Sequence, residues 1–301
     1  MIPVALKKWL GIPHLCHNPR SIFIGLIGGV GDLVSAAPSV VALKKKYPSA
    51  KISFGVGDGI FFNTIKNDPN IDHFETPFFY DTWKKRKRRI TYRKKYKEHD
   101  LVFLLDNGTL DWWKSKKHLM DIYAEKCGVI LEQRRPIFYL DKDDFHEAKK
   151  KLLELGISEN DKLLVLSPET RSKKKMKEWP YEKFLSLIQK IRENHDFKIV
   201  TMVSKDNLND YDGTISLKGY PLGPSAAMIN RSNFYLGLDN GLTHIASAFE
   251  TKIVSIHLGH PKEVCGIISP NALIISNGIF CDPISISVDT VFKEVEKLFL
   301  S

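Results

Sequence analysis

The sequence has few cysteines and no uninterrupted apolar segment long enough to be a clear membrane anchor. Its four cysteines are scattered along 301 residues without a CxxC pair, which favours a reducing compartment over a disulfide framework. The first twenty residues carry three basic side chains and lack the apolar run of a signal peptide. With 43% hydrophobic and 27% charged residues, wholesale disorder and fibrous repeats are excluded. We therefore expect a soluble cytoplasmic protein with room for two domains.

One stretch, residues 21–43, is apolar enough to suggest a membrane span. Asp32 lies at its centre, behind Gly28, Gly29 and Gly31. A charge and a glycine cluster at the midplane of a bilayer would be costly. The pattern instead indicates a strand, a glycine turn and a helix.

Short apolar runs alternate with helical patterns along most of the chain, which is typical of βα units and parallel sheets. A helix over 143–155 ends at Gly156, and the polar turn that follows places a domain boundary, giving domains 1–157 and 158–301. The predicted strands are 22–27, 51–56, 73–76, 101–106, 163–166, 198–203, 215–217, 234–238 and 252–257. The other predicted helices are 33–46, 119–127, 181–193, 225–231, 242–249 and 288–299.

The glycine turn at 28–32 does not match either common nucleotide-binding pattern. A dinucleotide fingerprint needs a third glycine where Val34 stands, and no glycine is followed by the Lys-Ser or Lys-Thr of a P-loop. What remains is Asp32, a carboxylate at the end of a strand, where α/β proteins place ligands. The alternative is that Asp32 is only a helix N-cap.

A second strand-turn-helix motif runs over 238–244. The backbone amides of 240–243 could hold a phosphate, while Asp239 or His244 could contact a ribose or phosphate oxygen. The alternative is a capped, buried helix with His244 satisfied in the core. Both interpretations stay open on these residues alone.

A third motif, at 170–180, follows the strand that ends at Ser167-Pro168 and is rich in lysine. A lysine held against a diphosphate can stabilise the charge that develops on a leaving group. The alternative is a solvated loop, which most of these lysines fit.

The net charge of +10 is concentrated in one window. Residues 84–97 hold ten lysines and arginines and no acid, so the rest of the chain is balanced. Such a window attracts anionic partners such as phosphates, nucleic acid or an acidic membrane surface, unless it is only a solvated helix face or loop. Two histidine-containing segments, 14–17 and 257–260, have loosely ligand-like spacing, but no fourth ligand is implied and no metal site is expected.

Together, the order and spacing of these motifs resemble glycosyltransferase family 9, the ADP-heptose:lipopolysaccharide heptosyltransferases. The segment 31–52, from Gly31-Asp32 through Pro38 to Leu43-Lys44 and Tyr47-Pro48, is similar to the family's "GD…P…LK..YP.A.I". Lys177-Glu178-Trp179-Pro180 with Phe184 is similar to "K.WP...F". Residues 239–246 are similar to "D(S/T)G..H.A", with Asn240 in place of the usual Ser or Thr. The resemblance covers most of the chain.

The resemblance implies a GT-B fold, in which two Rossmann-like domains with parallel sheets face each other across a central cleft. The first domain would bind the acceptor and the second the nucleotide-sugar. The implied reaction is an inverting transfer of a sugar, heptose from ADP-heptose, to a saccharide of the lipopolysaccharide inner core or a similar acceptor. No metal or other cofactor is expected. The implied location is the cytoplasm, peripheral at the inner face of the inner membrane.

The resemblance also assigns roles to individual residues. Asp32 would be the base that deprotonates the acceptor hydroxyl, and Lys177 would neutralise the departing diphosphate. The remaining donor-binding residues would be Thr170, Arg171, Asp239, Asn240, Gly241 and His244. The acceptor-binding residues would be Gly31, Arg86, Arg88, Arg89 and Arg93.

Two alternatives compete with this reading. A nucleic-acid-binding protein would explain the basic window, but the chain has no recognisable RNA- or DNA-binding module, and no nucleic-acid partner is expected. A family member that uses a different sugar nucleotide would keep the same motifs. The expected partners are therefore a nucleotide-sugar donor, an anionic glycolipid or saccharide acceptor, and the membrane surface.

Overall fold

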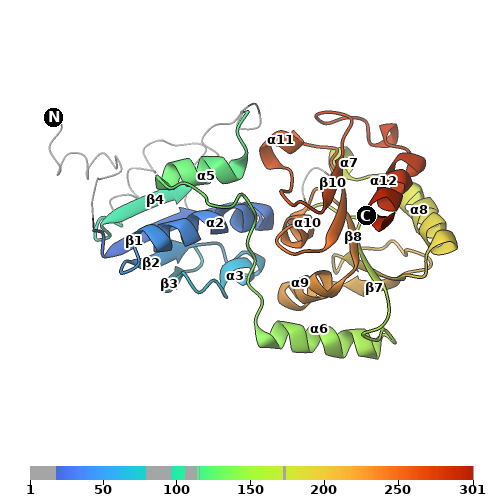
Figure 1. Cartoon of the computed structure of the whole chain (residues 1–301), viewed down its shortest axis with the longest axis horizontal. Helices are drawn as coiled ribbons and strands as arrows, with labels where there is room; N and C mark the ends of the chain where they lie inside the picture. The colour runs from blue at the N-terminus through green and yellow to red at the C-terminus, as the bar shows by residue number, and fades with distance from the viewer. Residues whose placement is uncertain (1–17, 79–95, 106–113, 115, 172–173, 301) are drawn as a thin grey trace. The chain divides into compact units, whose positions relative to one another are not determined.

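The computed structural model describes residues 18–78, 96–105, 114, 116–171 and 174–300. The chain forms two compact units, Met1–Arg134 and Arg135–Ser301. Each unit is built on one parallel sheet with helices packed against it (Figure 1). The predicted α/β class with two parallel sheets is confirmed.

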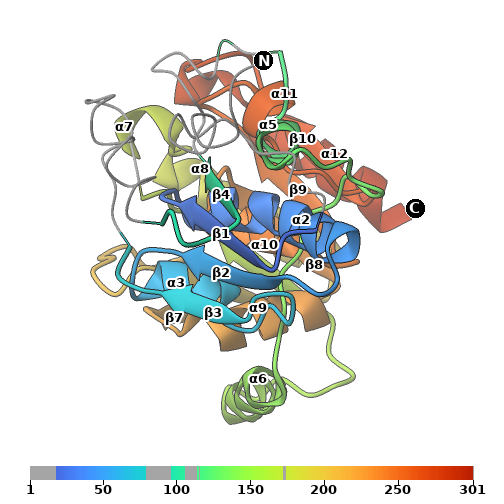
Figure 2. The ribbon, with the colours of Figure 1, turned by 90° about the vertical axis from the view of Figure 1, so that its left-hand side faces the viewer.

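The first unit has a four-stranded sheet in the order β3-β2-β1-β4, which Figure 2 shows strand by strand. In the central strand β1, Ile22 pairs with Ile52 on one side and with Leu101 on the other. Because a central parallel strand is covered on both faces, it reads as a continuous apolar run. The strands are β1 (Ser21–Leu26), β2 (Lys51–Gly55), β3 (His73–Glu75) and β4 (Leu101–Leu105), and the helices are α2 (Val30–Lys46), α3 (Ile60–Ile65) and α5 (Leu119–Cys127).

The second unit has a six-stranded sheet in the order β10-β9-β8-β5-β6-β7. Its apolar core includes Leu166 of β5, Leu236 of β8 and Phe184 of a covering helix. The strands are β5 (Leu163–Ser167), β6 (Lys198–Val203), β7 (Ile215–Lys218), β8 (Phe234–Leu238), β9 (Lys252–Ile256) and β10 (Ala272–Ile275). The helices are α6 (Lys142–Glu154), α7 (Lys174–Lys177), α8 (Tyr181–Asn194), α9 (Leu222–Arg231), α10 (Gly241–Ala246), α11 (Lys262–Cys265), α12 (Val288–Leu300) and the 3-10 helix η2 (Pro283–Ser285).

Both sheets contain a point where the strand order reverses. In the first unit the chain runs from β1 to β2 and β3 and then returns to the other side of β1 as β4. In the second it runs from β5 to β6 and β7 and returns beside β5 as β8. Open α/β sheets bind ligands at the carboxyl ends of the strands at such points. The glycine turn follows β1, and the lysine-rich loop and the Asp239 turn follow β5 and β8.

The division between the units falls earlier than the boundary expected between residues 157 and 158. Helix α6 packs against α9 of the second unit, as Figures 1 and 2 both show. It begins with a capping box in which Asp141 and Asp144 bond each other's backbone N–H. Asp144 is buried, and a Cβ on Gly223 of α9 would lie 1.9 Å from its Oδ1. Residues 135–157 therefore belong with the second unit.

Several short elements differ from the sequence-based expectation. Helices α3, α7 and α11 and the edge strand β10 were not predicted, and each has six residues or fewer. Helix α10 ends at Ala246, earlier than expected, and α2 begins at Val30, earlier than expected. Within the described residues, no helix is long and apolar enough to cross a membrane.

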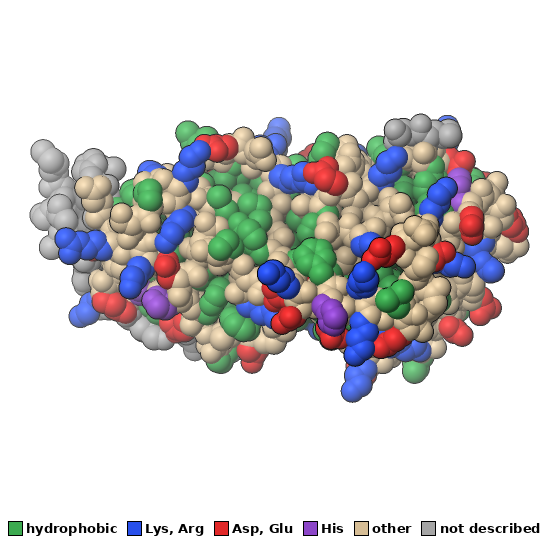
Figure 3. All heavy atoms as spheres, turned by 60° about the horizontal axis from the view of Figure 1, so that its bottom comes forward, with side chains coloured by type: hydrophobic (Ala, Val, Ile, Leu, Met, Phe, Trp, Pro, Cys, Tyr) green, Lys and Arg blue, Asp and Glu red, His purple; other side chains and the backbone are tan. Residues whose placement is uncertain are grey.

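The basic window lies almost entirely outside the described residues. Figure 3 shows acidic and basic side chains interspersed over one face. Arg86, Arg88, Arg89 and Arg93 lie outside the described residues, while Lys97, the last residue of the window, is exposed.

Candidate active site

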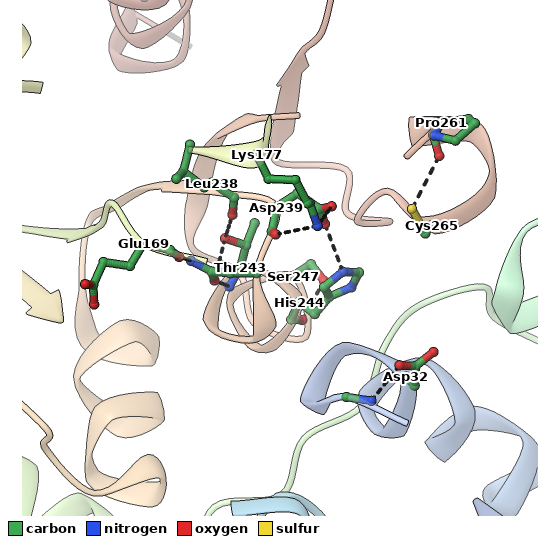
Figure 4. Close-up of polar contacts among 12 residues, drawn as sticks. Asp32, Glu169, Lys177, Leu238, Asp239, Thr243, His244, Ser247, Pro261 and Cys265 are labelled. Carbon is green, nitrogen blue, oxygen red and sulfur yellow. Dashed lines mark hydrogen bonds and ion pairs between the residues drawn. The ribbon is translucent and has the colours of Figure 1, made fainter. Parts of the chain in front are cut away.

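Asp32 is the third residue of α2, in the turn that follows β1. Gly29 is the residue before the helix, so Asp32 is not the N-cap that the alternative interpretation expected. The Gly29 N–H donates to Asp32 Oδ2 at 2.7 Å (Figure 4), in the manner of the returning half of a capping box. The Tyr123 hydroxyl donates to Asp32 Oδ1 at 2.9 Å. Each carboxylate oxygen of Asp32 therefore accepts a hydrogen bond.

The glycines before α2 make room for this carboxylate. A Cβ on Gly28 would lie 2.6 Å from the Asp32 Cβ, closer than real side chains approach. Gly31, expected to contact the acceptor, is the second residue of α2 and is partly exposed. The turn thus serves to place an aspartate at the carboxyl end of β1.

In the second unit, Lys177 and Asp239 form a buried ion pair. Lys177 is the last residue of α7, and Asp239 directly follows β8. The Lys177 Nζ lies 2.9 Å from Asp239 Oδ2 (Figure 4), and each residue is only 8% exposed. A Cβ on Gly259 would lie 2.7 Å from the Lys177 Cε, so this glycine leaves space for the lysine.

Two histidines flank the same carboxylate. His244, from α10, has its Nε2 3.6 Å from Asp239 Oδ1 (Figure 4). His257 directly follows β9, the strand beside β8, and is 0% exposed. Among the described residues, no group hydrogen-bonds either ring nitrogen of His257 or the Nδ1 of His244. His244 is therefore not the fully hydrogen-bonded core histidine of the alternative interpretation.

The buried groups shift one another's pKa. Burial raises the pKa of Asp239, but the nearby His257, the His244 hydrogen bond and the Lys177 ammonium outweigh it and hold that pKa well below its usual range. Burial lowers the pKa of His257 to about 4, although the Asp239 carboxylate opposes this. His257 is therefore neutral at neutral pH.

Asn240 connects the ends of β5 and β8. Its Oδ1 accepts the Thr243 N–H at 3.0 Å and so caps α10. Its Nδ2 donates to Ser167 Oγ and to the Glu169 carbonyl, each at 2.8 Å. The Thr243 amide, one of those expected to hold a phosphate, is therefore already used. Gly241 is the first residue of α10.

The other predicted donor-site residues lie in the loop after β5. Thr170 is buried, and its N–H donates to Glu178 Oε1 at 2.9 Å. Arg171 is exposed. The structure thus brings Lys177, Asp239 and His244 together, with Thr170 on the loop that leads to Lys177.

The sequence did not predict that Tyr123 would contact Asp32 or that His257 would lie beside Asp239. Tyr123 is 91 residues from Asp32 along the chain, and nothing in the sequence links them. From the sequence, His257 has only a loosely ligand-like spacing to His260, although its place at the end of an apolar run puts it at the same sheet edge as Asp239. Within the described part of the chain, no group of three or more His, Cys, Asp or Glu side chains could hold a metal ion.

The two groups of residues suit complementary chemistry. A fixed carboxylate such as Asp32 can accept a proton from a hydroxyl. A buried ammonium such as that of Lys177 can stabilise negative charge on a ligand. The first group stands on the first unit and the second group on the second unit.

Comparisons with known proteins identify the family of the chain. A family model described as glycosyltransferase family 9 (heptosyltransferase) matches residues 79–291, more than half of the chain. No curated protein matches significantly.

Solved structures show the same fold at low sequence identity. A glycosyl transferase family 9 protein from Veillonella parvula has a TM-score of 0.76 at 19% identity, covering 94% of this chain and 98% of that one. The Escherichia coli ADP-heptose LPS heptosyltransferase II has a TM-score of 0.69 at 14% identity, covering 93% and 98%. The iron-containing dodecameric glycosyltransferase TibC from enterotoxigenic E. coli has a TM-score of 0.63 at 13% identity, covering 94% and 76%. The predicted GT-B fold class is thus confirmed, and the chain belongs to glycosyltransferase family 9 and is a glycosyltransferase.

Proposed function

We propose that this glycosyltransferase transfers heptose from ADP-heptose to a saccharide of the lipopolysaccharide inner core or a similar acceptor, with inversion. The observation that carries the proposal is the buried Lys177–Asp239 pair at the strand-order reversal of the second unit. Membership of family 9 and the likeness to a protein described as an ADP-heptose heptosyltransferase support the choice of donor.

In the proposed step the acceptor hydroxyl oxygen attacks the anomeric carbon of the donor. Asp32 takes the hydroxyl proton as the new carbon–oxygen bond forms. The bond from the anomeric carbon to the diphosphate breaks, and its electron pair leaves with the diphosphate oxygen. A single displacement of this kind inverts the anomeric configuration.

Lys177 is suited to the departing diphosphate. An ammonium has three N–H donors; one faces Asp239 Oδ2 at 2.9 Å, and another lies 3.5 Å from the Asp239 carbonyl oxygen. The third can reach a phosphate oxygen while Asp239 keeps the nitrogen in place. Burying an ion pair carries a desolvation cost, so the pair fits a binding role better than a stabilising one. Thr170, Arg171, Asn240, Gly241 and His244 would complete the donor site.

The proposed transfer uses Lys177 as the cation and no metal ion. TibC is described as iron-containing, whereas the step proposed for this chain is written with Lys177 as its cation. The rate should persist after dialysis against EDTA, and a rate that vanishes and returns with Mg²⁺, Mn²⁺ or Fe²⁺ would contradict this.

For the acceptor, we assign binding to the first unit, through Gly31 and the basic window. Cations at Arg86, Arg88, Arg89 and Arg93 would attract the anionic saccharide and lipid headgroups. The enzyme would then work in the cytoplasm, at the inner surface of the membrane that holds its acceptor.

The proposal is tested with a panel of sugar nucleotides, following release of the nucleoside diphosphate with a purified inner-core acceptor. ADP-heptose should give the highest kcat/KM, and proton NMR of the product should show the inverted anomer. A thermal shift with an oligonucleotide but none with ADP would instead favour nucleic-acid binding. If only a different sugar nucleotide released its nucleoside diphosphate, that sugar nucleotide would be the donor.

The first variant to compare is Asp32→Asn. It should lower kcat by about 10² to 10⁴ because the proton acceptor is lost, while the donor Kd stays nearly unchanged. Asn can still accept the Gly29 N–H, so the helix start is kept. An Asp32→Asn enzyme with wild-type turnover would exclude Asp32 as the base.

A further inference from the structure

We propose that Tyr123 is a positioning residue for Asp32, holding the carboxylate in the orientation that accepts the proton. This inference rests on the proposed function, because it assumes that Asp32 is the base. Tyr123 would not touch the substrate; it would act only through its hydrogen bond to Asp32 Oδ1.

The side chain of Tyr123 offers one hydroxyl to this site. Tyr123 is 1% exposed, and the phenol oxygen is the one polar atom of a tyrosine side chain. That oxygen lies 2.9 Å from Asp32 Oδ1. A phenylalanine would fill the same space without the hydroxyl.

Asp32 is held from two independent elements. The Gly29 N–H, at the start of its own helix, bonds Oδ2, while Tyr123, on α5, bonds Oδ1. A carboxylate has about four lone-pair positions, so these two bonds leave others free to accept a proton. Because both oxygens are hydrogen-bonded, the carboxylate plane is fixed, and the lone pairs that remain free point in a fixed direction.

Helix α5 has its own hydrogen bonds at both ends, so the position of Tyr123 does not depend on its bond to Asp32. At its start, the Met120 N–H donates to His118 Nδ1 at 3.1 Å, and at its end Gly128 adopts the left-handed conformation with φ of 63°. Lys46, the last residue of α2, donates to the Gly128 carbonyl at 2.8 Å. Helices α2 and α5 are therefore tied together at the ends remote from Asp32, and Tyr123 adds the tie beside it.

The test is Tyr123→Phe, with Tyr220→Phe as the matched control. Tyr220→Phe removes a hydroxyl bond in the second unit, the one that Tyr220 donates to the carbonyl of Glu147 on α6 at 3.3 Å. Tyr123→Phe should lower kcat by about tenfold to a hundredfold, the usual effect of misplacing a reacting group, with the donor Kd unchanged. The control should keep wild-type kcat.

The split between kcat and the substrate constants gives a readout that a purely structural role would not move. A misdirected carboxylate slows the chemical step without weakening substrate binding, so kcat should fall while the acceptor KM and the donor Kd keep their wild-type values. A kcat equal to that of the control, or a loss confined to the acceptor KM, would overturn the inference even if the thermal midpoint falls.

The double variant with Asp32→Asn separates this inference from the proposed function. If Tyr123 acts only through Asp32, Tyr123→Phe should not slow the residual turnover of Asp32→Asn further, measured by slow accumulation of nucleoside diphosphate. An equal loss in both backgrounds would show that Tyr123 acts elsewhere. Wild-type turnover in Asp32→Asn would instead refute the base on which both proposals depend, and failure of Tyr123→Phe alone leaves the proposed function intact.

Discussion

His257 is a fully buried imidazole placed beside the Asp239 carboxylate. Neither ring nitrogen is hydrogen-bonded by a described group, and burial lowers the pKa of His257 to about 4. A buried polar group without a hydrogen-bond partner lowers the free energy of unfolding. His257 lies next to the Lys177–Asp239 pair of the candidate site.

The shifted pKa of His257 predicts an acid-sensitive fold. Between about pH 4 and 6.5, the unfolded chain binds a proton that the folded chain does not, so the free energy of unfolding rises with pH over that window. Lowering the pH from 7 to 5 should therefore remove about 2 kcal/mol through this residue. Asp239 adds nothing there, because its pKa is lowered and its contribution is lost only at more acidic pH.

Urea unfolding at pH 5 and pH 7 checks this prediction. The His257→Gln variant has no imidazole to titrate, so its stability should fall less between the two pH values than that of the wild type. Equal losses in the two proteins would show that His257 is not held neutral.

The turn from β8 into α10 depends on the amide of Asn240. One side chain caps the helix and bonds the end of β5, so it fixes the neighbouring strand ends relative to each other. A serine at this place can form the cap but cannot reach both partners on the β5 side.

Two substitutions separate these roles. Asn240→Ser should keep the cap and lose the two N–H donors, while Asn240→Asp should keep the cap but turn an oxygen toward the Glu169 carbonyl. Each should destabilise the second unit by about 1–3 kcal/mol, with Asp the worse because an acceptor then faces an acceptor. Urea midpoints at pH 7 give the order, and a more stable Asn240→Asp would contradict it.

The sequence predicted most strands and the longer helices, because each is a long apolar or periodic run between turn residues. The four-residue helices α7 and α11 are too short to show a period. The edge strand β10 is an apolar run of only four residues, Ala272–Ile275. Runs of this length do not distinguish strand from helix.

The candidate site was predictable where it depended on strand ends. Lys177 and Asp239 follow neighbouring parallel strands, so their motifs could be placed at one edge. The bond from Tyr123 to Asp32 could not be predicted, since it depends on how α5 packs on α2. A capped helix was one of the two interpretations of the α10 motif. The two hydrogen bonds from Asn240 to the end of β5 and the loop after it could not be predicted, because they depend on how β5 and β8 pack side by side.

Taken as a whole, the chain divides its chemistry between two units. The first holds Asp32 and the second holds Lys177, Asp239 and both flanking histidines. The charge is also unequally divided: the basic window at 84–97 equals the net charge of +10 and belongs to the first unit. Under the proposed function, the cationic first unit would attract an anionic acceptor and the buried ion pair of the second unit would hold the diphosphate of the donor.

This division predicts which substrate the basic window serves. Replacing Arg86, Arg88, Arg89 and Arg93 by Gln should raise the acceptor KM or weaken binding to anionic vesicles, with ADP-sugar affinity unchanged. Attraction between charges in water is screened within about 8 Å at physiological salt, so the difference in acceptor KM between the wild type and the variant should shrink as salt is raised. Titrations of acceptor and donor at low and high salt measure both effects. A variant that loses donor binding and keeps acceptor binding would show that the two units bind the opposite substrates.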